Sequence, residues 1–150
     1  NGSIINLSKI VEDSISKGEK RDSTDIEHSI YVKGDSDLLA MVVCNLVDNG
    51  LKYSPEDEKV NLSLKRSNGS ASLIVEDYGI GIPREERDMV FTSFYRATNA
   101  EKHGINGYGL GLSLAMSIIN GFDGTILLTD NSPKGTKITV TLPAINVEQD

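Results

Sequence analysis

Hydrophobic and polar residues alternate with the period of an α-helix over residues 35–55, which predicts an amphipathic helix there. The apolar face of the predicted helix carries Leu39, Val42, Val43, Leu46, Val47, Gly50 and Leu51. The opposite face carries Met41, Asn45, Asp48, Asn49 and Lys52. Asp35 or Ser36 is available as the N-cap, and Pro55 is expected to end the helix.

The polar face of this helix suggests a ligand. Asn45, Asn49 and Lys52 follow one another at intervals of four and three residues, so they form one row along the helix. Amide oxygens suit Mg²⁺ when phosphates supply the remaining charge, and a lysine adds a positive charge for those phosphates. The alternative is an ordinary solvated face with two incidental asparagines, and the helix alone favours that alternative.

The remaining pattern predicts an α+β domain. Helical period marks 4–17 and 110–120. A proline at the start and several acids early in the segment predict a short helix at 83–90. Alternation marks strands within 25–32, 60–65, 71–76, 124–129 and 136–142. Residues 18–25 are expected to be a loop, 67–70 a hairpin turn and 91–109 a long functional loop. Because the strands come in hairpin pairs, we expect two layers, with helices on one face of a mixed or antiparallel sheet.

Composition limits the class of protein. The 150 residues suit one domain, 1–150, with a core at about 4–143. The net charge of −7 argues against a nucleic-acid partner, and no apolar run or signal peptide predicts membrane contact. The single Cys44 is expected to be a small core side chain, which agrees with a cytoplasmic setting. The opening Asn1-Gly2-Ser3 reads as an arbitrary start, so we expect a piece of a longer protein.

Two glycine-containing segments add candidate chemistry. Asp77 ends a predicted strand and precedes Gly79 and Gly81, which leaves main chain without side-chain bulk beside a carboxylate. A flat ring can approach there, with Asp77 accepting a hydrogen bond from an exocyclic amine; the alternative is a plain Asp-Gly turn.

The second segment, 107–112, places three alternate glycines before a helix, whose N-terminal N–H groups attract phosphate. Its spacing is neither the P-loop nor the dinucleotide fingerprint, and the alternative is a flexible hinge.

Together and in this order, the segments resemble the catalytic ATP-binding domain of two-component sensor histidine kinases, in the GHKL ATPase superfamily. Residues 44–55, CNLVDNGLKYSP, match its asparagine box, and residues 77–83, DYGIGIP, match its first glycine box. Residues 90–96, VFTSFYR, match the phenylalanine box, and GYGLGL at 107–112 matches the second glycine box. Residues 135–143 resemble the last glycine segment. The resemblance implies an α/β sandwich with a mixed five-stranded sheet and three main helices on one face.

The resemblance also implies roles for individual residues. Asn45 and Asn49 would lie at the triphosphate as Mg²⁺ ligands, Asn49 the more direct, with Lys52 on phosphate oxygens and Tyr53 packed near the nucleotide. Asp77 would bind the adenine amine, with Thr136 beside it. The floor of the site would be shaped by Gly79, Gly81 and Ile82. The hinge and phosphate cradle would be formed by Gly107, Tyr108, Gly109, Leu110, Gly111 and Leu112. The lid would be anchored by Phe91 and Phe94, with Arg96 reaching the phosphates. The catalytic group would be Asn45, Lys52 and Arg96.

The implied reaction is transfer and not hydrolysis. In the hydrolases of the superfamily a glutamate stands where this chain has Asn45, and a neutral amide cannot act as a general base. Neither His28 nor His103 has the sequence context of the family's phosphoacceptor. We therefore expect a monomeric domain that binds Mg-ATP and phosphorylates a histidine on a separate helical domain of the same parent, which then serves a response regulator. That parent is expected to be anchored in the inner membrane.

Two positions depart from the family pattern. Tyr108 stands where the second glycine box usually has Thr or Ser. Gly50 replaces the usual Ala and weakens the helix by about 1 kcal/mol. Neither change removes a charged or ligating group, which favours an active kinase domain. The alternatives are a GHKL-type ATPase and a degenerate nucleotide-binding interaction module.

Overall fold

The structure, a computed structural model, describes residues 2–16, 22–53, 60–79, 110–131 and 134–146. The elements are β1 (Ser3–Asn6), α1 (Leu7–Ser16), β2 (Asp22–Ile26), β3 (Tyr31–Gly34), α2 (Ser36–Tyr53), β4 (Val60–Ser67), β5 (Ser70–Glu76), α4 (Leu110–Gly121), β6 (Thr125–Asp130) and β7 (Thr136–Ile145). The helix predicted at 83–90 and the loop predicted at 91–109 lie outside the described residues.

The strands form one mixed sheet in the order β1-β3-β7-β5-β4-β2, with β6 also paired to β7. Strand β7 is long enough to serve two neighbours on one edge, because β6 pairs with its residues 136–141 and β3 with its residues 144–145. Among the described strands only β2 and β4 run parallel. The predicted α+β fold with a mixed sheet is confirmed, but the sheet has seven strands and not five.

Both additional strands lie near the N-terminus, where the prediction was wrong. Residues 4–6 were assigned to a helix, but they belong to β1 and pair with β3. Asn6 caps a helix that starts only at Leu7, because its Oδ1 atom accepts a hydrogen bond from Lys9 N at 3.1 Å. The single strand predicted within 25–32 is two strands, with Ser29 between them at a φ of 61°. Part of the loop predicted at 18–25 belongs to β2.

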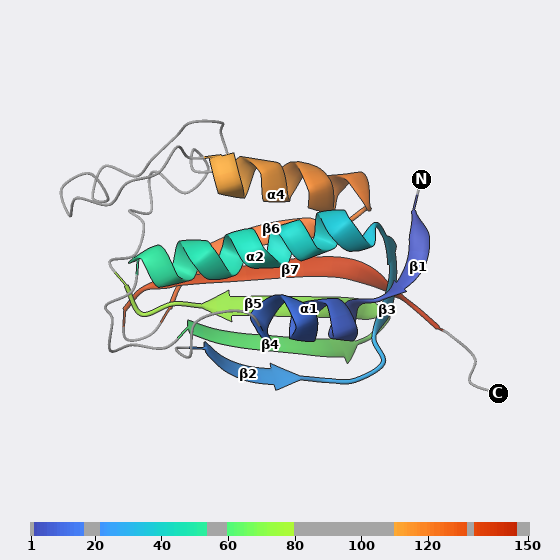
Figure 1. Cartoon of the computed structure of the whole chain (residues 1–150), viewed down its shortest axis with the longest axis horizontal. Helices are drawn as coiled ribbons and strands as arrows, with labels where there is room; N and C mark the ends of the chain where they lie inside the picture. The colour runs from blue at the N-terminus through green and yellow to red at the C-terminus, as the bar shows by residue number, and fades with distance from the viewer. Residues whose placement is uncertain (1, 17–21, 54–59, 80–109, 132–133, 147–150) are drawn as a thin grey trace.

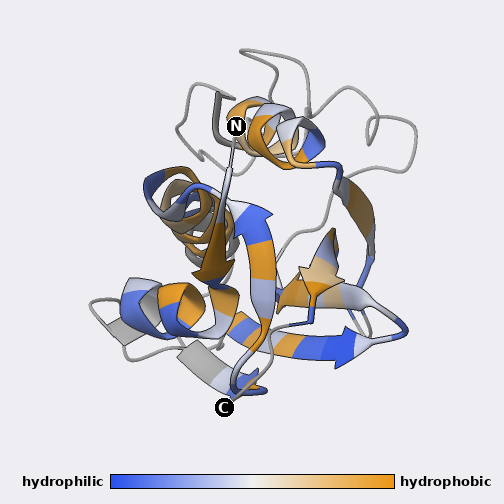
Figure 2. Cartoon of the chain, turned by 90° about the vertical axis from the view of Figure 1, so that its right-hand side faces the viewer, coloured by the Kyte–Doolittle hydropathy of each residue, from blue (hydrophilic) through white to orange (hydrophobic). Residues whose placement is uncertain are grey.

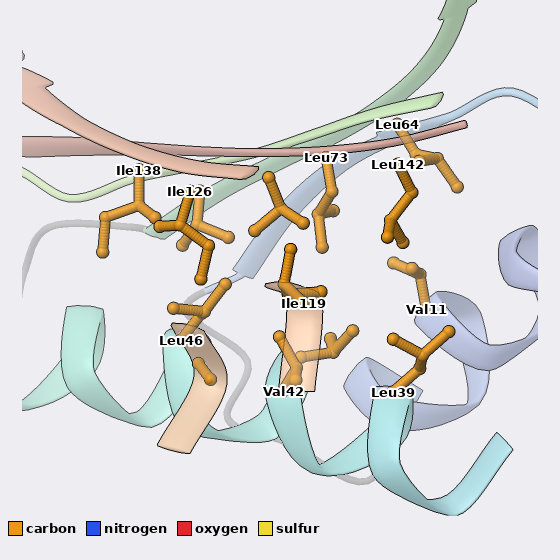
Figure 3. Close-up of a cluster of buried hydrophobic side chains, with 14 of the residues drawn as sticks. Val11, Leu39, Val42, Leu46, Leu64, Leu73, Ile119, Ile126, Ile138 and Leu142 are labelled. Carbon is orange, nitrogen blue, oxygen red and sulfur yellow. The ribbon is translucent and has the colours of Figure 1, made fainter. Parts of the chain in front are cut away.

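Three helices, α1, α2 and α4, cover one face of the sheet, as Figures 1 and 3 show. In Figure 2 hydrophobic and hydrophilic residues alternate along the strands, and the buried set of β5 is Ala71, Leu73 and Val75. These side chains meet those of the helices in one cluster, in which Val42 and Leu46 of α2 point at the sheet. Each such aliphatic side chain stabilises the fold by about 1.5–3 kcal/mol.

Helix α2 starts as predicted, because the Oδ1 atom of Asp35 accepts a hydrogen bond from Leu38 N at 3.0 Å. Its predicted apolar face is buried from Leu39 to Val47. The prediction that Cys44 lies in the core is wrong, since its side chain is exposed. Position 44 falls with Met41 and Asp48 on the outward row of the helix, and both of those side chains are also exposed.

The hairpin turn predicted at 67–70 joins β4 to β5. Asn68 and Gly69 have φ angles of 52° and 80°, and two consecutive positive φ values are what a two-residue hairpin turn of the primed type needs. None of the helices in the described part of the chain is long and apolar enough to cross a membrane.

Candidate functional site

Four elements bring the described part of the predicted site to one end of the molecule. Figure 1 shows the C-terminal end of α2, the end of β5, the start of α4 and the start of β7 on the same side, on the left of that view. Asp77 directly follows β5, Thr136 begins β7, and Asn45 lies in the second half of α2. The sheet and the helix layer therefore both contribute to this end.

Asp77 is the centre of the described part of the site. Its side chain is only 5% exposed. Its Oδ1 atom accepts two main-chain hydrogen bonds, from Gly79 N at 3.0 Å and from Thr136 N at 3.1 Å. The main chain adds a third bond, from Asp77 N to the carbonyl oxygen of Thr136 at 2.9 Å. No donor in the described ranges bonds to Oδ2, so the capacity of that oxygen to accept a hydrogen bond is not used within the described part of the chain.

Burial raises the pKa of Asp77 from its ordinary value of 3.8 to about 6, and the two backbone hydrogen bonds lower it in part. A buried carboxylate with one oxygen fixed and the other unbonded within the described residues costs free energy when it ionises. Perturbed carboxyl groups of this kind concentrate at functional sites.

The raised pKa gives a pH dependence of binding. If Asp77 accepts a hydrogen bond from the adenine amine, as the resemblance implies, only the ionised carboxylate offers Oδ2 as an acceptor. Nucleotide affinity is then expected to fall below about pH 6, approaching tenfold per pH unit. Calorimetric titration with ADP from pH 5 to pH 8 measures this dependence.

The stability of the free domain is expected to respond with the opposite sign. The folded state holds the proton of Asp77 more tightly than the unfolded state, so this contribution to stability is full below about pH 4 and is lost as the pH rises through about 6. The difference of about two units between the pKa values of the folded and unfolded states corresponds to about 3 kcal/mol of unfolding free energy. The difference in unfolding free energy between wild type and Asp77→Asn, followed across this range, isolates the contribution, and a flat difference would contradict it.

The turn between β6 and β7 supports Asp77 from the other side. The side-chain amide of Asn131 donates from Nδ2 to the carbonyl oxygen of Asp77 at 2.7 Å. Gly135 has a φ of 103°, and a Cβ atom there would lie 2.8 Å from the carbonyl carbon of Asp77. Gly135 belongs to the segment that resembles the last glycine segment of the family, whereas no signal in the sequence indicates a role for Asn131.

A second asparagine holds the residue after Asp77. The Nδ2 atom of Asn61 on β4 donates to the hydroxyl oxygen of Tyr78 at 2.7 Å. Neither Asn61 nor Tyr78 is among the site residues predicted from the sequence. The segment 77–79 is thus fixed by contacts to both β4 and the β6–β7 turn.

The structure describes only some of the predicted site residues. Gly79 and Thr136 lie beside Asp77, Asn45 is half-buried, and the Leu112 side chain belongs to the core. Helical main chain without described side chains is all that the structure gives for Asn49, Lys52, Tyr53, Leu110 and Gly111. Outside the described residues lie Gly81, Ile82, Phe91, Phe94, Arg96, Gly107, Tyr108 and Gly109. The roles predicted for all these residues stay predictions.

A cluster of acidic or other metal-ligating side chains does not provide the metal site in the described part of the chain. Within the described ranges no group of three or more His, Cys, Asp or Glu side chains can hold a metal ion. A hollow of about 360 Å³ at the start of α2 includes Asp35 and Asp37 in its lining, and both carry the same charge sign as phosphate. The amide pair Asn45 and Asn49 provides neutral oxygens, which suit Mg²⁺ already bound to a triphosphate.

The sequence of the chain shows the family to which it belongs. The sequence model described as "Histidine kinase-, DNA gyrase B-, and HSP90-like ATPase" matches residues 34–146. The chain belongs to this ATPase family.

The relatives are sensor kinases. The chain is 33% identical over 148 residues to the sensor-like histidine kinase SenX3 of Mycobacterium tuberculosis (strain ATCC 25618 / H37Rv). The aligned region covers 94% of this chain and 36% of that protein. It is 36% identical over 126 residues to the sensor histidine kinase WalK of Bacillus subtilis (strain 168), covering 83% and 21% respectively. The chain thus spans about a third or less of the length of these relatives.

A solved structure of a sensor histidine kinase has the same fold as this chain. The mycobacterial sensor histidine kinase MprB superposes with a TM-score of 0.84 at 28% sequence identity, over 96% of this chain and 98% of that chain. The predicted resemblance to the sensor kinases and the predicted fold are confirmed.

Proposed function

We propose that this chain binds Mg-ATP and donates the γ-phosphoryl group to a histidine on a separate phosphoacceptor domain of the same parent protein. The observation that carries the proposal is Asp77, whose buried carboxylate is fixed through Oδ1 and has no partner on Oδ2 among the described residues. An exocyclic amine of adenine donates the hydrogen bond that this oxygen lacks. The family model and the sensor-kinase relatives support the assignment.

The polar side chains of α2 would bind the phosphate groups and their metal ion. Asn45 and Asn49 offer amide oxygens to Mg²⁺, while Lys52 and Arg96 offer positive charge to phosphate oxygens. Magnesium, when bound, neutralises charge on the phosphoryl group during transfer. Because Asn45 is neutral, it does not activate water, which favours an imidazole as the acceptor. The γ-phosphorus then exchanges its bond to ADP for a bond to the imidazole nitrogen.

The wider setting follows from the same proposal. The partner is a helical phosphoacceptor domain, and a response regulator is served indirectly. We place the domain in the cytoplasm, as a monomer, within a parent protein anchored in the inner membrane.

Replacing Asn49 by alanine is expected to weaken Mg-ATP binding by about 10–100-fold and to remove most of its magnesium dependence. The loss of one polar contact to a charged group costs about 1.5–3 kcal/mol, which gives this range. Calorimetric titration with ATP, with and without Mg²⁺, measures it. The matched control is Asn120→Ala on the exposed end of α4, which is expected to bind like wild type.

Transfer is tested by adding the histidine-bearing helices of the parent to the chain with radiolabelled ATP. We expect base-stable, acid-labile label on the added helices and little label on the chain alone. Rapid steady-state phosphate release without labelled protein would identify an ATPase. An absence of heat with both Mg-ATP and Mg-ADP would overturn the proposal in favour of an interaction module.

A further inference from the structure

A side-chain amide outside the nucleotide-binding motifs holds the main chain of Asp77. Asn131 lies between β6 and β7, and its Nδ2 atom donates to the carbonyl oxygen of Asp77 at 2.7 Å. The two residues are 54 positions apart in the sequence, so this bond ties the β6–β7 turn to the end of β5. The Asn131 side chain is half-buried, where a hydrogen bond is stronger than in water.

The β6–β7 hairpin closes without this bond. Asp130 is paired with Thr136, and the main-chain nitrogen of Asn131 donates to the carbonyl oxygen of Gly135 at 3.0 Å. The bond from Nδ2 is therefore additional to those of the hairpin, and its acceptor belongs to Asp77, the buried acid of the candidate site.

The direction of that carboxylate depends on both sides of Asp77. Thr136 N and Gly79 N fix Oδ1, while Asn131 fixes the carbonyl oxygen of the same residue. With the main chain and one carboxylate oxygen fixed, the direction of Oδ2 is also fixed. A hydrogen bond that Oδ2 accepts from an N–H group of a ligand is sensitive to this direction, because such bonds weaken steeply as their angle departs from linear.

We propose that Asn131 is a positioning residue for adenine recognition, holding Asp77 so that Oδ2 faces the exocyclic amine of the base. The inference rests on the function proposed above and adds the residue that sets its base selectivity. Asn131 acts through Asp77 and does not itself touch the nucleotide.

The test compares ATP with inosine triphosphate, in which a carbonyl oxygen replaces the exocyclic amine. Wild type is expected to prefer ATP by at least about tenfold, since the ionised carboxylate meets a donor in one base and an acceptor in the other. Asn131→Ala is expected to weaken ATP binding by about five- to tenfold and to leave the affinity for inosine triphosphate unchanged, so that the preference shrinks. Calorimetric titration with both nucleotides and Mg²⁺ gives the ratio.

A purely structural role would lower both affinities, or the active fraction, and would leave the ratio intact. Asn131→Asp is the second variant, because it keeps the side-chain shape but replaces the donor with a negative oxygen. Its preference for ATP is expected to shrink further, and the pH midpoint of ADP binding is expected to rise, since the added charge favours the protonated form of Asp77. The control is Asn120→Ala, which should keep the wild-type ratio.

The outcomes separate the two claims. If wild type binds neither nucleotide, the proposed function fails. If wild type prefers ATP and both Asn131 variants, folded by circular dichroism, keep the full preference, the positioning role alone is refuted. A reduced ratio in either folded variant, with the control unchanged, supports it.

Discussion

Asp77→Asn is expected to reduce the affinity for Mg-ATP at least about 100-fold while the domain stays folded. The asparagine oxygen can still accept from Gly79 N and Thr136 N, so its NH₂ group takes the place of Oδ2. That group then faces the adenine amine, and two donors meet. Loss of a hydrogen bond to a charged acceptor plus an unpaired buried donor sums to about 3 kcal/mol or more, which corresponds to that factor.

Folding is expected to be unaffected or improved by the same substitution. A neutral amide does not bear the cost of ionising a buried group, so the unfolding free energy at pH 8 should equal that of wild type or exceed it by up to about 3 kcal/mol. Asp123→Asn is the matched control: it removes the same charge at an exposed turn position with a φ of 65°, which asparagine accepts. Wild-type affinity in Asp77→Asn would exclude this carboxylate from binding.

The parts of the fold that could be predicted are those whose signal is local. Helix α2 and strands β4 and β5 bury one face each, so their period is visible in the sequence itself. Strands β1 and β3 have four residues each and form because partners distant in the sequence lie beside them, as β3 and β7 do. No period can show in four residues, and the N-terminal prediction failed there.

The site divides in the same way. Asp77 was predicted because an acid at a strand end before Gly-x-Gly is a local pattern, and the family motif supplied its expected partner Thr136. Asn131 was missed because its acceptor lies 54 residues away, and an asparagine in a turn is common for other reasons. Cys44 was predicted to be buried because cysteine side chains usually are, but it lies on the outward-facing row of α2. A tertiary contact decided the case of Asn131, whereas the helical period alone places Cys44 on the outward row with Met41 and Asp48.

Gly135→Ala is expected to be the most damaging substitution among the described glycines. Its φ of 103° is strained for any residue with a side chain, and the added Cβ would lie 2.8 Å from both the Asp77 carbonyl carbon and the Tyr78 Cα atom. Both neighbours are main chain, which cannot move aside as a side chain can. Backbone strain of about 1–3 kcal/mol plus the clash predicts a loss of at least about 3 kcal/mol and a fall in Tm of about 6–12 °C.

Two other glycines separate the causes of this loss. Gly69 has a φ of 80° but no atom within 4 Å of an added Cβ, so Gly69→Ala bears only the conformational strain, about 1 kcal/mol. Gly121 has neither a positive φ nor a close neighbour, and Gly121→Ala should stay within about 1 kcal/mol of wild type. Calorimetric melting of the three variants measures the order.

Nucleotide binding should distinguish Gly135 from its controls even in the folded fraction. The clash forces the β6–β7 turn away from Asp77, which breaks the contacts that Asn131 and Thr136 make with that residue. Mg-ATP affinity should therefore fall in Gly135→Ala and remain unchanged in Gly69→Ala, whose turn joins β4 and β5 at the other end of β5. Equal stability losses in these two variants would mean that strain alone acts at Gly135 and that the close approach to Asp77 contributes nothing.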